Sequence, residues 1–185
     1  MKINEIERLY HGTDRCFDEF DFHKAKGFKD FGKGYYLTTN FNQALRWAQR
    51  KGSRNSKAYV YSYRVECADA ENLKILELLK YDLKWLDFIS QNRIYGKDTD
   101  YDIIYDGMAD SQYTDISELL QAYVQKEKTA EEIIERIKWK EGIIANQYCF
   151  KNKEALQLLR DKVVYVLEKD KDGIWIIDEG DCDRV

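Results

Sequence analysis

The stretch Gly27–Gln49, GFKDFGKGYYLTTNFNQALRWAQ, runs from a glycine-rich turn through a strand pattern into a helix pattern. Residues Tyr35–Thr38 favour a strand, because aromatic and β-branched residues suit a pleated surface. Asn40 can cap the following helix, and Gln43 stands three residues later, where it completes a capping box. Apolar residues then recur at helical spacing, at Phe41, Ala44, Leu45 and Ala48.

The first eight residues of this stretch read G-x-x-x-x-G-K-G, one hydroxyl short of a phosphate-binding P-loop. A P-loop needs a buried strand before it and a helix directly after it. Here the preceding residues FDFHKAK are too charged for a buried strand, and Gly34 replaces the magnesium-binding Ser or Thr. The sequence therefore excludes a P-loop and predicts a strand opening that a ligand can approach closely.

The remaining patterns describe an α+β protein with mostly antiparallel strands. Other strands are expected at Arg8–Tyr10, Ala58–Val65, Lys74–Leu76, Ile103–Tyr105, Gln147–Phe150, Val163–Leu167 and Ile174–Ile177. Other helices are expected at Tyr81–Gln91, Ile116–Lys126, Thr129–Lys138 and Asn152–Arg160. The 185 residues suit a single domain, residues 1–185, in which a helical section of about 81–140 is inserted between early and late strands.

Composition limits the function classes. The formal net charge of −4 argues against a general nucleic-acid binder, which needs an electropositive face. A local basic run nevertheless contains Arg46, Arg50, Lys51, Arg54 and Lys57. It is either a solvated helix end or a patch that faces a polyanion or a cofactor phosphate.

The four cysteines, at positions 16, 67, 149 and 182, have no CxxC spacing, so we expect no metal site. Neither a signal peptide nor an apolar segment long enough to span a membrane is visible. We therefore expect a cytoplasmic protein with free thiols and no membrane partner.

Three residues are candidates for ligand binding. Tyr36 lies at the start of the predicted strand, and Trp47 lies on the flank of the predicted helix. Two such aromatic faces can sandwich a flat cationic ring, although both residues can equally be core aromatics. His11 follows the strand pattern RLY and is either a catalyst or a structural hydrogen-bonding residue, whereas His23 is expected to be structural.

Together these motifs resemble the ADP-ribosyltransferase superfamily, in its diphtheria-toxin and poly(ADP-ribose) polymerase branch with a His-Tyr-[Glu/Asp/Gln] triad. The resemblance is carried by LYHGT (9–13), FGKGYYLTTNFNQALRWA (31–48) and NQYCFKNKEALQLL (146–159). Tyr36 and Trp47 are eleven residues apart, as the two aromatics are in that branch, although the second is usually tyrosine there. The chain is most similar to an uncharacterised bacterial branch, with YDIIYDGMAD (101–110) as a further shared motif.

The resemblance implies a split β-sandwich with a cleft that holds NAD+ as co-substrate. It assigns catalytic roles to His11, Tyr36 and Gln147. His11 would bind ribose hydroxyls, the Gly12 backbone would bind the nicotinamide carboxamide, and Thr13 would touch the adenosine ribose. Tyr36 and Trp47 would flank the nicotinamide, and Ala44 stands where a small hydroxyl residue often contacts the carboxamide.

The implied function is a mono-ADP-ribosyltransferase that moves ADP-ribose from NAD+ to a protein or nucleic-acid acceptor and releases nicotinamide. By analogy with the bacterial branch, it would be the toxin of a toxin–antitoxin pair, with an antitoxin protein as partner. Gln147 can hydrogen-bond a 2′-hydroxyl but carries no charge with which to stabilise an oxocarbenium-like ribose. Two alternatives therefore stay open: a weak or inactive NAD-binding module and an NAD+ glycohydrolase.

Overall fold

The structure is a computed structural model that describes residues 3–66, 70–109, 115–138 and 146–180. By contacts the chain divides into two compact units. Unit 1 consists of Met1–Phe20, Tyr36–Asn72 and Lys153–Val185, and unit 2 consists of Asp21–Tyr35 and Leu73–Asn152. The prediction of a single domain stays a prediction, and each unit is described by itself.

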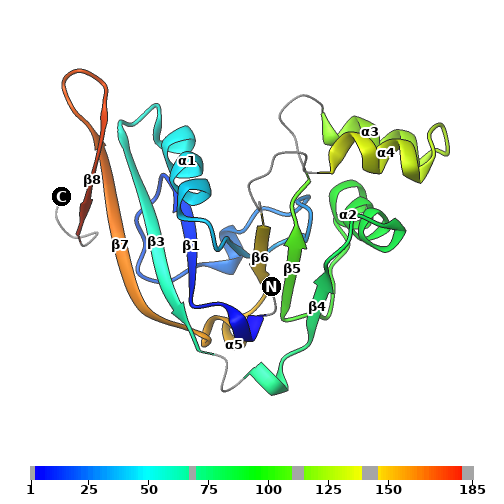
Figure 1. Cartoon of the computed structure of the whole chain (residues 1–185), viewed down its shortest axis with the longest axis horizontal. Helices are drawn as coiled ribbons and strands as arrows, with labels where there is room; N and C mark the ends of the chain where they lie inside the picture. The colour runs from blue at the N-terminus through cyan, green and yellow to red at the C-terminus, as the bar shows by residue number, and fades with distance from the viewer. Residues whose placement is uncertain (1–2, 67–69, 110–114, 139–145, 181–185) are drawn as a thin grey trace. The chain divides into compact units, whose positions relative to one another are not determined.

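Unit 1 contains a four-stranded antiparallel sheet in the order β1-β3-β7-β8. Its strands are β1 (Arg8–Thr13), β3 (Lys57–Val65), β7 (Leu159–Lys169) and β8 (Trp175–Glu179). Figure 1 shows helix α1 (Phe41–Gly52) beside β1 and β3. β1 is an edge strand, and His11 and Gly12 pair there with Tyr61 and Val60.

Small residues hold α1 against this sheet. Ala44 and Ala48 are fully buried and form a core cluster with Ala58, Val60 and Leu167. A Cβ added at Gly12 would lie only 2.0 Å from the carbonyl oxygen of Ala44. The glycine therefore permits the close approach of the helix backbone to β1. Asn40 caps α1 by accepting a hydrogen bond from the Gln43 backbone, as predicted. The reciprocal half of the predicted capping box is wrong, because the Asn40 N–H donates to the Thr38 hydroxyl instead of the Gln43 side chain.

The second sheet is mixed and has the strand order β2-β6-β5-β4. Its members are β2 (Tyr35–Leu37), β6 (Asn146–Phe150), β5 (Ile103–Gly107) and β4 (Ile75–Leu78), and the unit boundary falls within β2, after Tyr35. β5 is antiparallel to β6 and parallel to β4. Gly34 precedes β2 and could not carry a Cβ, which would meet Cys149 Sγ at 2.3 Å. Close packing on β6 thus accounts for this glycine.

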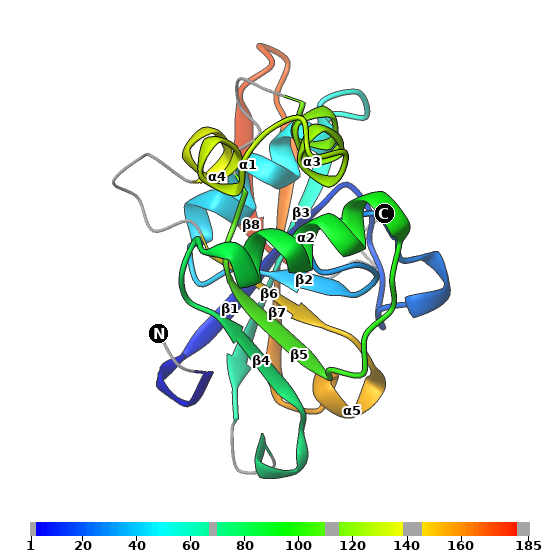
Figure 2. The ribbon, with the colours of Figure 1, turned by 90° about the vertical axis from the view of Figure 1, so that its right-hand side faces the viewer.

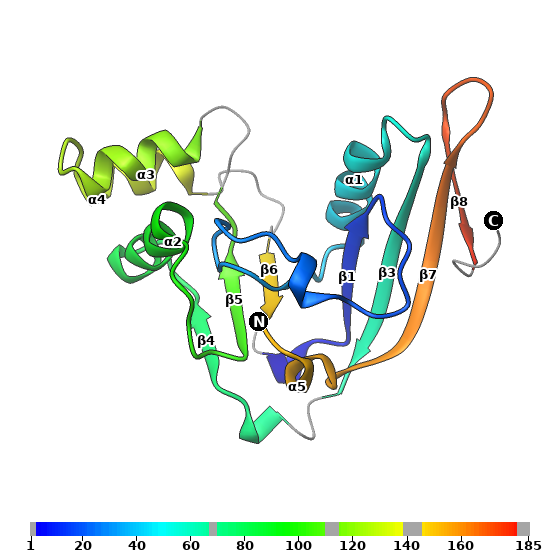
Figure 3. The ribbon, with the colours of Figure 1, turned by 180° about the vertical axis from the view of Figure 1, so that it is seen from behind.

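The described residues of unit 2 form the α-helices α2 (Leu83–Tyr95), α3 (Ile116–Val124) and α4 (Ala130–Ile137). Figure 2 shows α2 in front of β5, and the buried Trp85 indole donates a hydrogen bond to the Gly107 carbonyl. α3 and α4 lie side by side (Figure 3). The predicted capping box of α4 is confirmed, with Thr129 and Glu132 bonding reciprocally.

All eight predicted strands are found, most of them longer than expected, and the P-loop exclusion is confirmed because β2 follows the glycines. The predicted helix Asn152–Arg160 is wrong over its second half. Helix α5 covers only Lys153–Leu156, and β7 begins at Leu159. Pairing of β7 with β3 from its first residue outweighs the local helical pattern. Short 3₁₀ helices occur at Ile3–Glu5, Phe22–Lys24 and Ala70–Asn72.

The protein is therefore α+β, with one antiparallel and one mixed sheet. Within the described ranges, no helix is long and apolar enough to cross a membrane.

Candidate functional site

His11 lies on β1, and its ring is held by the neighbouring strand. Its Nδ1 lies 2.7 Å from the Tyr36 carbonyl oxygen. A carbonyl oxygen can only accept, so Nδ1 carries the proton, and in the neutral ring Nε2 is the acceptor nitrogen. The structure thus brings His11 and the Tyr36 backbone together and fixes the imidazole tautomer.

The backbone of Gly12 faces the outer edge of the sheet. Tyr10 exchanges two backbone hydrogen bonds with Thr38, of 2.8 and 2.9 Å, on the side of β1 away from β3. Backbone groups alternate in direction along an antiparallel strand, so Gly12, two residues later, presents its N–H and C=O to that same edge. The Val65 N–H donates to the Glu7 carbonyl, so the backbone groups of the odd-numbered residues of β1 point toward β3. Those of the even-numbered residues, Gly12 included, therefore point toward the outer edge.

One side chain reaches the Gly12 edge from α1. Lys51 Nζ lies 3.5 Å from the Gly12 carbonyl oxygen. Within the described ranges, no residue other than Lys51 bonds to this peptide group on its edge side. A carbonyl oxygen has two lone pairs, so a second donor can bind there.

Tyr36 and Trp47, the two aromatic residues expected to flank the nicotinamide, differ in their surroundings. Tyr36 is half-buried, whereas Trp47 is 50% exposed on α1. The Trp47 ring has the Arg50 guanidinium 5.2 Å and the Lys51 ammonium 5.7 Å from its centroid. Two cations already lie at this ring, so a cationic nicotinamide would add a third positive charge there. The flanking role of Trp47 stays a prediction.

Thr13 and Ala44 are the other predicted cofactor contacts. Thr13 is 5% exposed, and its hydroxyl accepts a hydrogen bond from the Arg15 backbone. Ala44 is 1% exposed and belongs to the core beneath α1. Both residues are accounted for by packing and local turn structure, and their contacts with NAD+ stay predictions.

An aromatic cluster that the sequence reasoning missed supports the His11 ring. Phe17 and Tyr61 stack with centroids 4.4 Å apart, and both rings lie within 6.5 Å of the imidazole. The Tyr61 hydroxyl donates to the Phe17 carbonyl and accepts from its N–H, which pins the segment after β1. Burial raises the pKa of Tyr61 to about 12. The strand predicted at Ala58–Val65 includes Tyr61, but the sequence pattern did not reveal Phe17 as its partner.

Gln147 lies on β6 in unit 2, where a buried carboxylate holds its amide. Gln147 Nε2 donates to Asp30 Oδ2 at 2.8 Å, and Arg93 Nε pairs with Asp30 Oδ1 at 2.5 Å. Asp30 and Gln147 are 4% and 8% exposed. An amide fits this position because it can donate to a carboxylate, which a glutamate side chain cannot do when ionised.

Asp30 and Arg93 were also missed from the sequence. The one available signal is that Asp30 is the only acidic residue between Asp21 and Glu66. The neighbouring Lys29 is largely buried, and burial lowers its pKa. A single carboxylate in a lysine-rich segment suggests a specific partner, but the sequence did not identify Gln147 as that partner.

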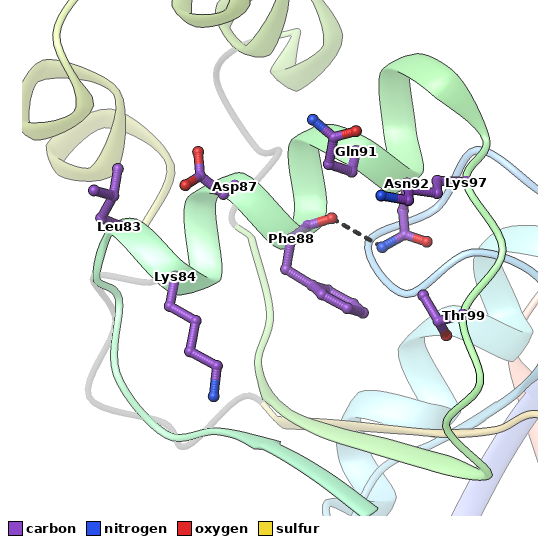
Figure 4. A pocket seen from close by; sticks show the side chains of 8 residues that line it. All are labelled: Leu83, Lys84, Asp87, Phe88, Gln91, Asn92, Lys97 and Thr99. Atoms are coloured by element: carbon purple, nitrogen blue, oxygen red, sulfur yellow. Dashed lines mark hydrogen bonds between the residues drawn. The ribbon is translucent and has the colours of Figure 1, made fainter.

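Unit 2 also contains a cavity of about 540 Å³ beside α2 (Figure 4). Its lining residues are Leu83, Lys84, Asp87, Phe88, Gln91, Asn92, Lys97 and Thr99. Asn92 donates to the Phe88 carbonyl, but its Oδ1 and the Thr99 hydroxyl are buried without a hydrogen-bond partner in the described part of the chain. A bound water or another donor would satisfy them. None of the predicted site residues lines this cavity.

Cysteine chemistry differs from the expectation. Cys16 is disulfide-bonded, so the expectation of free thiols is wrong for this residue, whereas Cys149 is a buried free thiol. Cys67 and Cys182 lie outside the described residues. Over the described ranges, no group of three or more His, Cys, Asp or Glu could hold a metal ion.

A family model described as "Protein of unknown function (DUF3990)" matches residues 8–160. No curated protein and no solved structure matches the chain. The matched region covers most of the sequence and includes the His11–Gly12 pair, Tyr36 and Gln147. The chain therefore belongs to the DUF3990 family.

Proposed function

We propose that the protein is an NAD+-dependent mono-ADP-ribosyltransferase with an ADP-ribosyltransferase-like fold. The observation that carries the proposal is the outward-facing peptide group of Gly12 at the edge of β1. A primary carboxamide has one acceptor and two donor hydrogens, which complement one N–H and one C=O. The nicotinamide amide would thus bind Gly12 much as Thr38 binds Tyr10 two residues earlier.

His11 supports this proposal through its tautomer. With its proton on Nδ1 and directed at the Tyr36 carbonyl, the neutral ring has an acceptor at Nε2. A ribose hydroxyl is a suitable donor for that nitrogen. The side chain of Tyr36, the residue whose carbonyl binds His11, would contact the nicotinamide ring, and the proposal does not require Trp47.

The chemistry is a substitution at C1′ of the nicotinamide-side ribose. The C1′–N bond breaks, and its electron pair goes to the pyridinium ring, which leaves as neutral nicotinamide. An acceptor oxygen or nitrogen forms the new bond to C1′ and loses its proton. An electrostatic environment that favours the oxocarbenium-like transition state accelerates this step.

Gln147 is the proposed third catalytic residue, and its amide keeps two alternatives open. Its Nε2 is directed at Asp30, so Oε1 is the group with which it would accept a ribose hydroxyl. An uncharged amide stabilises a developing cation less than a carboxylate does. A protein that binds NAD+ without transfer, or that transfers ADP-ribose to water, would have the same features.

Nicotinamide release and label transfer separate these functions. The protein is incubated with NAD+ labelled in its adenylate part, with a His11→Ala variant as control. Released nicotinamide together with a labelled protein or nucleic acid supports transfer. Nicotinamide without a labelled acceptor supports hydrolysis, and neither signal above the control contradicts both enzymatic functions.

The toxin role is part of the same proposal. Growth arrest on expression of the wild-type chain, absent with His11→Ala, would support it. Relief of that arrest by the protein of an adjacent small gene would identify the antitoxin. Normal growth with abundant folded wild-type protein would contradict the toxin role but not the enzymatic proposal.

A further inference from the structure

The outer face of α1 carries several cations around an exposed tryptophan. We call this set the α1 cation face; it consists of Arg46, Trp47, Arg50, Lys51 and Arg54. All five residues are exposed. At about 100° per residue, Trp47 lies between Arg50 and Lys51 on the helix surface, on the flank of the face that buries Ala44 and Ala48. Arg54 follows directly after the end of the helix.

These cations have few neutralising partners. No Asp or Glu occurs between Tyr36 and Val65, although the whole chain has a net charge of −4. In β3, the ammonium of Lys57 and the guanidinium of Arg64 are paired with carboxylates of β7. Across the described residues, no ion pair is found for the three arginines of the α1 cation face. Unneutralised positive charge on one face is the footprint of a polyanion site.

The tryptophan indicates which polyanion fits. The Arg50 and Lys51 charges lie 5.2 and 5.7 Å from the ring centroid of Trp47, so phosphates bound by them would lie close to the ring. Unpaired nucleobases stack on exposed aromatic rings, whereas the bases of a duplex are already stacked on each other. An acidic peptide would use the charges but would gain little from the ring.

We propose that the α1 cation face binds single-stranded nucleic acid. Lys51 connects this face to the Gly12 edge, because its Nζ lies 3.5 Å from the Gly12 carbonyl and 5.7 Å from the Trp47 ring. Bound nucleic acid would therefore lie beside the proposed nicotinamide site within unit 1. If the proposed transferase function holds, nucleic acid is its acceptor class, and a base nitrogen or a terminal phosphate oxygen forms the new bond to C1′.

Binding is measured without NAD+, by fluorescence anisotropy of labelled oligonucleotides of about twelve nucleotides, a length suited to such sites. Single-stranded DNA, single-stranded RNA and duplex DNA are compared, with polyglutamate as competitor. We expect one or both single strands to bind at least about tenfold more tightly than the duplex. Affinity should fall steeply with salt, as phosphate contacts require.

Variants of the face have matched controls in the chain. Arg46→Glu/Arg50→Glu should weaken binding at least about tenfold and reduce the magnitude of the salt slope by about 1.4, the value for two lost phosphate contacts on a single strand. Lys24→Glu/Lys26→Glu makes the same charge change at two exposed lysines of unit 2 and should have little effect.

Trp47→Ala should weaken binding about tenfold through lost stacking. Its control is Trp175→Ala, because the Trp175 ring also has a lysine over it, Lys169, at 5.1 Å. That control site lies between the acidic pairs Asp170/Asp172 and Asp178/Glu179. Thermal unfolding of each variant confirms that the comparison is between folded proteins.

The outcomes are distinct. The proposal is overturned if neither single-stranded DNA nor single-stranded RNA binds. It is also overturned if the duplex binds as tightly as the single strands. Displacement by polyglutamate at equal charge concentration, with no effect of Trp47→Ala, would indicate an acidic-protein site instead and also overturns it. His11→Ala should lower nicotinamide release about 30- to 150-fold yet keep oligonucleotide affinity, so failure of the proposed function and failure of this inference are separable.

Discussion

At the scale of single residues, His11 has the most specific environment of the predicted catalytic set. Its Nδ1 is bound to the Tyr36 carbonyl, which leaves Nε2 as the acceptor in the neutral ring. Loss of a hydrogen bond that leaves the ribose hydroxyl unpaired costs about 2–3 kcal/mol, so His11→Ala should lower nicotinamide release about 30- to 150-fold. The control is His23→Ala, because His23 is exposed in a 3₁₀ turn. Equal rates for both variants would contradict the role of His11.

The contact between Gln147 and Asp30 predicts the effect of a charge at position 147 on stability. Gln147→Glu would place a carboxylate against the buried Asp30 carboxylate, which Arg93 alone cannot compensate. We expect a loss of about 3 kcal/mol in the free energy of unfolding at pH 7, measured by urea denaturation. Gln157→Glu, at an exposed position, should change stability by less than about 0.5 kcal/mol.

The double variant Asp30→Asn/Gln147→Glu is the rescue test, since it restores an amide–carboxylate pair. It should recover part of the lost stability. If Gln147→Glu unfolds like the wild type, the carboxylate contact does not explain the amide at position 147. If the rescued double variant also releases nicotinamide at the wild-type rate, that result counts against a catalytic role of Gln147.

The burial of Tyr61 predicts how the stability of the protein depends on pH. Its pKa is raised to about 12 by burial, so the folded protein favours the neutral phenol. The stability it contributes is complete below pH about 10, the ordinary pKa, and is lost as pH rises toward 12. Urea denaturation should therefore show a steeper loss of stability above pH 10 for wild type than for Tyr61→Phe. Parallel curves would contradict a raised pKa.

At the scale of elements, the contact between α1 and β1 depends on one missing side chain. Gly12→Ala would put a Cβ 2.0 Å from the Ala44 carbonyl and should cost about 3 kcal/mol of stability through overpacking. Gly27→Ala is the control, since only the Lys33 side chain lies near, at 3.8 Å. Thermal denaturation that ranks the two variants equally would contradict this packing.

The elements also show what sequence can and cannot reveal. Strand alternation and caps are local, so the strands, the α1 cap and the capping box of α4 were predictable. The helix Asn152–Arg160 was not, because pairing of Leu159 with Val65 depends on residues far apart in the chain. The partners of Gln147 were missed for the same reason, since Asp30 is 117 positions away.

At the scale of the whole molecule, charge and contacts are both unevenly distributed. The chain is acidic, yet residues 36–65 contain six cations and no carboxylate. The average composition does not show this basic segment, and four of its cations form the α1 cation face of unit 1. The predicted residues His11, Gly12, Tyr36 and Trp47 all belong to that unit, which brings the proposed nicotinamide contacts and the α1 cation face into one compact part of the chain.

The central claim is that the peptide group of Gly12 recognises the carboxamide of NAD+. The direct measurement is the ¹H–¹⁵N NMR spectrum of the protein during titration with NAD+, in which the Gly12 amide is followed. We predict a saturable downfield shift of the Gly12 amide proton, because the carboxamide oxygen of NAD+ accepts a hydrogen bond from it. The amide of Gly173 is the control and should not shift, since a Cβ added at Gly173 would have no other atom within 4 Å. A Gly12 amide that stays unmoved at saturating NAD+ would contradict the account.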